Sequence, residues 1–451
     1  MNKQKQGTYH LISLGCAKNL VDTESMAQLL NRQGLMPTLH QDQAEYLIVN
    51  TCGFLKAARE ESISVLNDLS RKKAPWQKLI VTGCMPELHR EEILKAIPEV
   101  AGVLGTRRWM DIIDVIKATD HRRSNLPYTH FPFSPTIGHD EQGTHRVAIQ
   151  GSSAYLKIGD GCRRSCAYCL IPLIKGDLVS RPESKIIDDA KALQDAGIQE
   201  IILIAQDITD YGHDLNMRDG LTTLLESVVK AVPDVPWIRL MYTFPGYVSQ
   251  NLIQLMASET QILPYLDMPL QHADQKVLKA MNRPSNMVSV RKTLEQIRGQ
   301  MPEAALRTTF IVGFPNEDEK AFQNLVDFVK DTQFDHVGTF TYSFEQGTPA
   351  EPIGDPIPEN VKMKRMEYLM EVQSEISLKH NQQWIGKTMD VLVEGVDEEQ
   401  GIAIGRTYRD APEIDGLVVI EDPVPVGAMV QVRINSALMH DLVGKLVGSS
   451  D

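Results

Sequence analysis

One pattern constrains the fold of this 451-residue chain more than any other: between residues 147 and 380, a short apolar run followed by a helical pattern recurs six times. The predicted strands are 153–158, 200–205, 237–242, 265–268, 307–312 and 336–341, and the helical patterns include 182–196, 221–232 and 286–300. This alternation predicts a parallel sheet covered by helices. Six units are too few for an eight-fold barrel, so we expect an open (β/α)6 partial barrel with its site at the carboxyl ends of the strands.

The first hundred residues predict a separate parallel α/β domain. Strand-like runs over 9–14, 46–50 and 78–82 alternate with helical patterns over 22–33, 57–69 and 90–97. Each run leads into a cysteine: Cys16, Cys52 and Cys84. Because ligands of open α/β sheets lie beyond the carboxyl ends of the strands, these three cysteines should meet at one edge of the sheet.

Two further segments complete the predicted organisation. The stretch 121–146 carries prolines, histidines and polar residues, which is typical of a linker. Near the C-terminus, alternating runs at 389–393, 401–406, 417–420 and 429–437 predict a small antiparallel β-barrel of the oligonucleotide-binding sort. The predicted boundaries are therefore 8–120 for the α/β domain, 121–146 for the linker, 147–384 for the partial barrel and 385–451 for the terminal barrel.

Charge bears on the class of partner. The chain has a formal net charge of −13, and its terminal segment carries five basic and twelve acidic residues, a balance of −7. Surfaces that bind nucleic acid need cations, so we expect no stable nucleic-acid binding and a basic partner for the terminal barrel. No secretory signal opens the sequence and no apolar run approaches the roughly 18 residues of a membrane span, so we expect a cytoplasmic protein without a membrane partner.

A second cysteine triplet, Cys162, Cys166 and Cys169, lies on a loop after the first strand of the partial barrel. Thiolates are soft ligands suited to iron–sulfur clusters or zinc, and three of them can bind three irons of a cubane. The fourth iron is then open to a substrate or cofactor. Structural zinc needs four ligands, and a distal histidine could supply the fourth, so zinc stays an alternative.

The spacing C-x3-C-x2-C after the first barrel strand resembles the radical S-adenosylmethionine superfamily. The resemblance implies that Cys162, Cys166 and Cys169 hold a 4Fe–4S cluster whose open iron binds the amino and carboxylate groups of S-adenosylmethionine. It also implies that Tyr168, the bulky residue before the third cysteine, lies against the adenine. A core aromatic is the alternative reading of Tyr168.

The first triplet makes the resemblance more specific. The motifs Leu-Gly-Cys16-Ala-Lys-Asn-Leu-Val-Asp, Asn-Thr-Cys52-Gly-Phe and Thr-Gly-Cys84 are similar to the N-terminal domain of the methylthiotransferases. That family has the same order of parts, ending in a TRAM-like β-barrel. The resemblance implies a second 4Fe–4S cluster, held by Cys16, Cys52 and Cys84, whose open iron carries the sulfur to be transferred.

Within this family, the sequences around Cys16 and over 410–416 resemble the branch that modifies a ribosomal protein. That branch is expected to add a methylthio group to the β-carbon of an aspartate in small-subunit ribosomal protein S-twelve. The acidic terminal barrel agrees with a basic ribosomal protein as substrate. A deoxyadenosyl radical would remove the hydrogen from this unactivated carbon, so we expect no catalytic acid or base. Forming this radical by reductive cleavage of S-adenosylmethionine also requires an electron donor protein.

Residues near the predicted strands are weaker candidates for contact with the cofactor or substrate: Gln206, Asp207, Tyr242, Gln271, His272, Arg307 and Gly313. Structural alternatives are a helix cap for Asp207, a scaffold hydrogen bond for His272 and a turn with positive φ for Gly313. Lys18, Asn19 and Asp22 follow Cys16 and either frame the first triplet or, for the last two, cap a helix.

Two other functions stay open from the sequence alone. The sister branch of the family methylthiolates an isopentenyladenosine of transfer RNA, and it would favour a basic surface. A zinc-stabilised RNA-binding module that uses the terminal barrel would need no catalysis at all.

Overall fold

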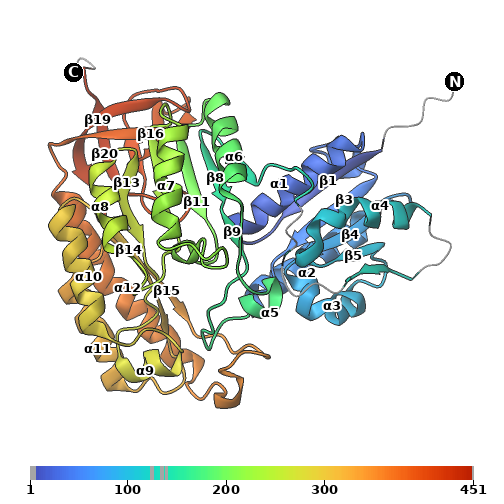
Figure 1. Cartoon of the computed structure of the whole chain (residues 1–451), viewed down its shortest axis with the longest axis horizontal. Coiled ribbons are helices and arrows are strands. Elements are labelled where there is room, and N and C mark those ends of the chain that lie inside the picture. The colour runs from blue at the N-terminus through green and yellow to red at the C-terminus, as the bar shows by residue number, and fades with distance from the viewer. Residues whose placement is uncertain (1–6, 122–125, 133–136, 138–140, 449–451) are drawn as a thin grey trace. The chain divides into compact units, whose positions relative to one another are not determined.

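The computed structural model describes residues 7–121, 126–132, 137 and 141–448, and the chain forms two compact units (Figure 1). The first unit comprises Met1–Ala148, Tyr155–Pro182 and Glu345–Pro349. The second comprises Ile149–Ala154, Glu183–Phe344 and Ala350–Asp451. All six cysteines therefore belong to the first unit.

The first unit is built on a parallel sheet of six strands in the order β2-β1-β3-β4-β5-β6. The strands are β1 (Thr8–Ser13), β2 (Met36–Pro37), β3 (Tyr46–Thr51), β4 (Lys78–Gly83), β5 (Gly102–Leu104) and β6 (Tyr128–His130). The three predicted strands of this domain are confirmed. Strand β6 comes from the stretch predicted as a linker, part of which lies outside the described residues.

Helices cover both faces of this sheet. They are α1 (Ala17–Arg32), α2 (Lys56–Lys72), α3 (Met85–Ala96) and α4 (Ile112–Asp120), with short 3-10 turns η1 (Gln41–Gln43) and η2 (Thr106–Asp111). Helices α1 and α4 pack on the face that carries Ile48, and α2 and α3 pack on the face that carries Leu47 and Val49. Alternate strand residues thus serve opposite cores, as the two-residue period of a strand requires.

Helices α1 and α3 begin five residues before their predicted starts. The sequence prediction followed apolar periodicity and did not extend the helices back to the cysteines. The cysteines themselves stand at the N-cap positions, Cys16 for α1 and Cys84 for α3.

The loop of the second triplet also belongs to the first unit. It connects strand β9 (Gly159–Asp160), which pairs with β10 (Val179–Ser180), to the short helix α5 (Ile171–Lys175).

The second sheet has seven strands in the order β15-β14-β13-β12-β11-β8-β7 and is open, as predicted for a partial barrel. Its strands are β7 (Val147–Gln150), β8 (Ser153–Lys157), β11 (Glu200–Ile204), β12 (Trp237–Leu240), β13 (Ile262–Asp267), β14 (Ala305–Val312) and β15 (His336–Thr341). All six predicted strands are present, and β7 is an addition. Strands β11 to β15 pair in parallel.

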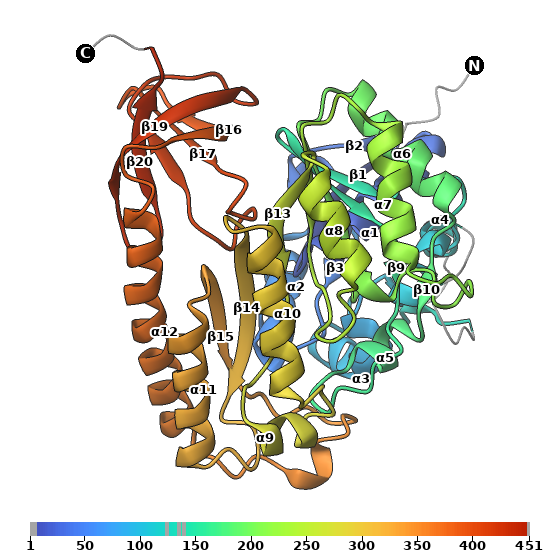
Figure 2. The same cartoon turned by 60° about the vertical axis from the view of Figure 1, so that its left-hand side comes forward.

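The connecting helices of the second unit alternate with these strands (Figure 2). They are α6 (Glu183–Asp195), α7 (Gly220–Ala231), α8 (Gln250–Ser258), α9 (Gln275–Ala280), α10 (Met287–Gln300), α11 (Glu319–Thr332) and α12 (Glu359–Gln382), with turns η3 (Ile208–Asp210) and η4 (Glu351–Ile353). Helix α12 leads into the terminal barrel.

The terminal barrel is closed, with strands in the order β16-β17-β18-β20-β19. They are β16 (Thr388–Asp397), β17 (Ile402–Arg406), β18 (Val418–Ile420), β19 (Met429–Ala437) and β20 (Leu442–Leu446). Inward-facing Val391, Val393, Val418 and Val432 fill its core. Strand β20 was not predicted, because glycine and lysine interrupt its short apolar pattern.

Among the residues that the structure describes, no helix combines the length and the apolar character that are needed to cross a bilayer.

Candidate two-cluster site

The three N-terminal cysteines follow three neighbouring strands. Cys16 comes after β1, Cys52 directly after β3 and Cys84 directly after β4. Because these strands are parallel, their carboxyl ends lie at one edge of the sheet, as predicted. The amide of Cys84 donates to the carbonyl of Thr51 at 2.9 Å, so the segments that follow β3 and β4 stay in register.

Two glycines allow these segments to approach closely. Gly15 has φ +94°, and a Cβ atom there would lie 2.8 Å from Cβ and 3.0 Å from Sγ of Cys52. A Cβ atom on Gly53 would lie 2.6 Å from Cα of Met85, the residue after Cys84. Only a residue without a side chain fits at either position, and this closeness brings the three cysteine segments together.

The side chain of Asn19, in α1, forms hydrogen bonds that stabilise the same edge of the sheet. Its side-chain amide donates to the carbonyl of Leu14 at 2.7 Å and to that of Asn50 at 3.3 Å. The side chain of Asn50 donates back to the carbonyl of Asn19 at 2.9 Å. Asn19 therefore frames the triplet. Neither Asn19 nor Asp22 caps α1, because both lie within the helix, where they are buried.

The charge of Lys175 acts on the first triplet. Burial raises the pKa of the Cys84 thiol to about 12, and Lys175 opposes that rise. Burial also raises the pKa of Cys52, again against a contribution from Lys175. Since thiolates bind metal, a buried cation beside the triplet favours the ligating form of the sulfur.

The second triplet lies on a loop whose backbone turns toward its own sulfurs. The amide of Arg164 donates to Sγ of Cys162 at 3.4 Å, and the amide of Ile171 donates to Sγ of Cys169 at 3.4 Å. Such bonds stabilise a thiolate and tune an iron–sulfur cluster. The loop is closed at its base, where the amide of Cys162 donates to the carbonyl of Gly176 at 3.1 Å.

The six cysteines form no disulfide bonds with one another. Within the described ranges, no three His, Cys, Asp or Glu side chains converge tightly enough to hold a single metal ion. In a cubane, each cysteine binds a different iron, so its ligands stand farther apart than those of one ion. The three-thiolate donor sets and the amides aimed at Cys162 and Cys169 fit a 4Fe–4S cluster.

Four of the weaker candidates lie just beyond strands of the second unit. Gln206 follows β11, Tyr242 follows β12 and Gln271 follows β13. Tyr242 and Gln271 have positive φ, +68° and +74°, which is costly for residues with side chains. The side-chain oxygens of Gln206 and Gln271 are buried without a hydrogen-bond partner. Asp207 caps η3, and its carboxylate accepts from the amide of Thr209 at 3.0 Å.

Glu317 holds two further candidates. It accepts from the amide of Gly313, where φ is +75°, at 2.9 Å, and it lies 3.2 Å from Nε2 of His272. Arg365 donates to the other oxygen of Glu317 at 2.7 Å. His272 thus makes the scaffold hydrogen bond that the sequence offered as an alternative, and Gly313 has the positive φ expected of a turn.

Arg307 forms ion pairs with two aspartates and does not extend from the carboxyl end of its strand. It donates to Asp267 at 3.0 Å and to Asp415 of the terminal barrel at 3.2 Å. Asp415 also accepts from the hydroxyl of Tyr265 at 2.6 Å. The segment 410–416 therefore meets interior residues of the partial barrel. The sequence offered it only as a sign of resemblance.

Sequence reasoning missed three buried cations of the first unit, Arg146, Lys157 and Lys175. Each contacts Asp22. One signal was available, because Lys157 stands within an otherwise apolar strand.

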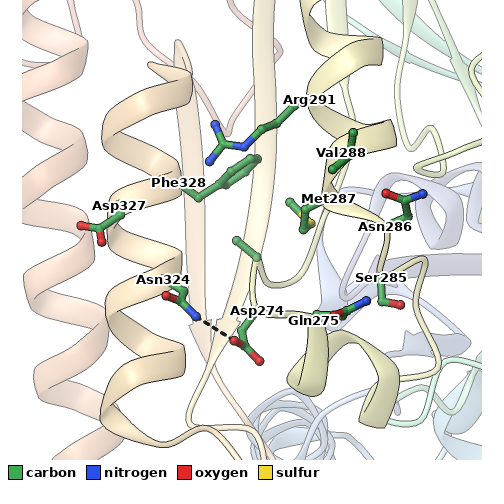
Figure 3. Close-up of a pocket in the computed structure, with 11 residues that line it drawn as sticks. Asp274, Gln275, Ser285, Asn286, Met287, Val288, Arg291, Asn324, Asp327 and Phe328 are labelled. Atoms are coloured by element: carbon green, nitrogen blue, oxygen red, sulfur yellow. Dashed lines mark hydrogen bonds between the residues drawn. The ribbon is translucent and has the colours of Figure 1, made fainter.

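A pocket of about 560 Å³ lies among α9, α10 and α11 in the second unit (Figure 3). Asp274 and Asn324 meet across it at 2.9 Å, and Arg291 lies over the ring of Phe328. The pocket includes none of the predicted site residues.

Comparison with known proteins agrees with this architecture. Residues 8–105 match the uncharacterized protein family UPF0004, residues 156–329 the radical SAM superfamily and residues 385–447 the TRAM domain. Among solved structures, the chain is similar to the radical S-adenosylmethionine methyltransferase TsrM from Kitasatospora setae, with a TM-score of 0.57. That match covers 76% of this chain and 74% of the other at 11% identity, which shows a shared fold.

Curated relatives are much nearer in sequence. The chain is 42% identical to the ribosomal protein uS12 methylthiotransferase RimO of Roseiflexus sp., with 97% of each protein covered. It is 40% identical to the protein of the same name from Bdellovibrio bacteriovorus, over 97% of each. The Microcystis aeruginosa protein of that name is 40% identical, over 98% of this chain and 99% of its own length. The chain belongs to the family of the RimO methylthiotransferases.

Proposed function

We propose that this chain adds a methylthio group to the β-carbon of an aspartate in ribosomal protein uS12, using S-adenosylmethionine and two 4Fe–4S clusters. One observation carries the proposal: two separate cysteine triplets lie in one compact unit. A radical enzyme that only cleaves S-adenosylmethionine needs one of them. The substrate follows from the names of the curated relatives.

Each triplet has an assigned task in this proposal. Cys162, Cys166 and Cys169 would hold the cluster that cleaves S-adenosylmethionine, and Cys16, Cys52 and Cys84 would hold the second cluster. When bound, the two clusters supply the radical and the sulfur. Tyr168 would lie against the adenine. The protein supplies position and exclusion of side reactions.

Gln206, Asp207, Tyr242, Gln271, Arg307 and Gly313 are proposed as the second unit's contribution to the cofactor or substrate. The unpartnered oxygens of Gln206 and Gln271 support this proposal, because a buried acceptor without a donor is costly unless a ligand supplies one. Arg307 would act through Asp267, which accepts from the amide of Tyr242 at 3.1 Å.

The terminal barrel is the proposed docking surface for the basic substrate. Two of its basic residues, Arg406 and Arg409, are buried, and so are the side chains of Asp410 and Asp415, so the balance of −7 is also that of its remaining charged residues. Acidic Asp390, Glu398 and Glu421 are exposed. Because the proposed substrate is a ribosomal protein, we expect the reaction, with its electron donor protein, to occur in the cytoplasm.

Mass spectrometry of a deletion strain tests the substrate. We expect uS12 from that strain to lack the methylthio group and transfer RNA to keep its modifications. Normal methylthiolation of uS12 would refute the proposal, and loss from transfer RNA alone would favour the sister activity.

A Cys84→Ala variant tests the division of labour between the triplets. We expect the purified variant to retain about four of roughly eight irons, since each cubane holds four, and to form 5′-deoxyadenosine without methylthio transfer. A Cys166→Ala variant is the matched control and should lose cleavage as well. Unchanged transfer by Cys84→Ala contradicts the role of the first triplet.

A further inference from the structure

The carboxylate of Asp22 contacts all three cations of a buried charge cluster in the first unit, and Asp160 contacts two of them, Lys157 at 2.6 Å and Arg146 at 3.2 Å. Asp22, in α1, accepts from Lys157 at 2.7 Å and from Arg146 at 2.5 Å through one oxygen. Its other oxygen accepts from Lys175 at 2.7 Å. The side chains of Asp22 and the three cations are at most 3% exposed.

Two of the three cations come from segments that flank the second triplet, and Arg146 lies just before strand β7. Lys157 ends strand β8, before Cys162, and Lys175 ends helix α5, after Cys169. Asp22 lies in the helix that starts immediately after Cys16. One carboxylate thus joins the helix of the first triplet to both ends of the loop that carries the second.

Helix α5 also contacts the first triplet through apolar groups. Cys84 packs against Leu170 and Ile174, which lie between Cys169 and Lys175. Arg107 donates to the carbonyl of Ile174 at 2.9 Å. Helix α5 therefore contacts the α/β domain that carries the first triplet through both ion pairs and apolar packing.

Stability alone is a weak reason for such a cluster. Burial would lower the pKa of Lys175, but Asp22, Cys84 and Asp160 raise it, so this lysine stays charged. Taking several ions out of water is costly, and apolar side chains of similar size often stabilise a protein at least as well. What a fully paired network offers is one defined geometry.

We propose that Asp22 is a positioning residue that fixes the separation between the two cysteine triplets. The inference rests on the proposed function, in which both triplets hold clusters. Without the Asp22 carboxylate, each triplet keeps its own three cysteines, but the atoms that must meet during transfer are misplaced. Cleavage of S-adenosylmethionine then continues while methylthio transfer fails.

The test uses an Asp22→Asn variant of the full chain, reconstituted anaerobically with both clusters. We expect unchanged iron content and 5′-deoxyadenosine formation within about twofold of the unmodified protein. Methylthio product per deoxyadenosine should fall at least about tenfold, because misplacement near 1 Å costs on the order of a hundredfold in rate. Pulsed electron paramagnetic resonance should show an altered magnetic interaction between the two reduced clusters.

Glu141→Gln is the matched control, because it removes the same charge from the same assembly. Glu141 pairs with Arg181 at 2.6 Å and lies 3.7 Å from Nε of Arg146, but it does not link Asp22 to either lysine. This variant should keep both the product ratio and the magnetic interaction.

An Asp22→Leu/Lys175→Met double variant guards against misfolding, since it removes a buried acid together with one of its cations. It should fold and show the same uncoupling. Retention of the product ratio and the magnetic interaction in Asp22→Asn overturns the inference, as does loss of iron from both triplets in both variants. If the unmodified protein transfers no methylthio group, the proposed function fails, and the magnetic interaction still tests the positioning role.

Discussion

At the scale of single residues, the most constrained charge outside the cysteine region is Glu200. It is fully buried in the second unit between Arg239 and Arg406, at 2.6 Å from each. Burial acts to raise the pKa of Glu200, but the two guanidiniums outweigh burial and lower it to about 2. Because Arg406 belongs to strand β17, this pair joins the terminal barrel to the partial barrel.

Replacing Glu200 by glutamine removes the carboxylate partner of Arg239 and leaves Arg406 paired with Glu394, which should cost about 3 kcal/mol of unfolding free energy. Urea unfolding followed by circular dichroism measures the loss. The control, Glu226→Gln on the exposed side of α7, should change stability by less than about 0.5 kcal/mol.

The same residue predicts a pH dependence. A carboxyl whose folded pKa is lowered from 4.5 to about 2 stabilises the fold fully above pH 4.5 and loses that contribution as the pH falls toward 2. The difference is worth about 3 kcal/mol. Between these pH values, the unmodified protein should lose more stability than Glu200→Gln does. Parallel pH curves for the two proteins would contradict this assignment.

At the scale of elements, the turn between β1 and α1 determines how closely the segments that carry Cys16 and Cys52 approach each other. A Gly15→Ala substitution should strain a left-handed backbone by about 1–2 kcal/mol and push Cys52 away. We expect iron content to fall toward about four per chain, while S-adenosylmethionine cleavage persists. Gly34→Ala is the matched control: Gly34 also has positive φ, +82°, but no atom lies within 4 Å of the added carbon. Equal iron loss in both variants would mean that strain, and not the clash with Cys52, is responsible.

Elements were predictable where one periodicity dominated. The strands of both sheets carry continuous apolar runs, and the edge where Cys16, Cys52 and Cys84 meet follows from parallel pairing. The starts of α1 and α3 were missed because a cysteine, which is a poor cap by composition, occupies the N-cap. The charge cluster around Asp22 was missed because it depends on tertiary contacts between residues more than 100 positions apart.

At the scale of the whole molecule, the terminal barrel has a structural role and, in the proposed function, a recognition role. Its buried Arg406 pairs with Glu200 of the partial barrel. Deleting the terminal barrel would remove this ion pair as well as the proposed docking surface, so a deletion could not separate the two roles. Surface variants separate them. Asp390→Lys/Glu398→Lys/Glu421→Lys should raise the KM for uS12 by about tenfold, since exposed ion pairs contribute up to about 1 kcal/mol each.

Steady-state kinetics at two salt concentrations checks this expectation. Cleavage of S-adenosylmethionine without uS12 should stay constant, and added salt should narrow the difference in KM. Lysines in place of exposed Glu226, Glu295 and Glu371, which are on helices of the second unit, make the same change in net charge and should leave KM unaltered. A comparable rise in KM with that control would assign the effect to total charge instead of to the terminal barrel.

The dispersed origin of the cations around Asp22 has a consequence for biosynthesis. A ribosome releases the α/β domain before Arg146, Lys157 and Lys175, and a buried carboxylate without a cation is unfavourable by several kcal/mol. Helix α1 therefore cannot dock fully on its sheet until the chain has emerged past residue 175. The arrangement of the two cysteine triplets relative to each other is therefore fixed only in this late folding step.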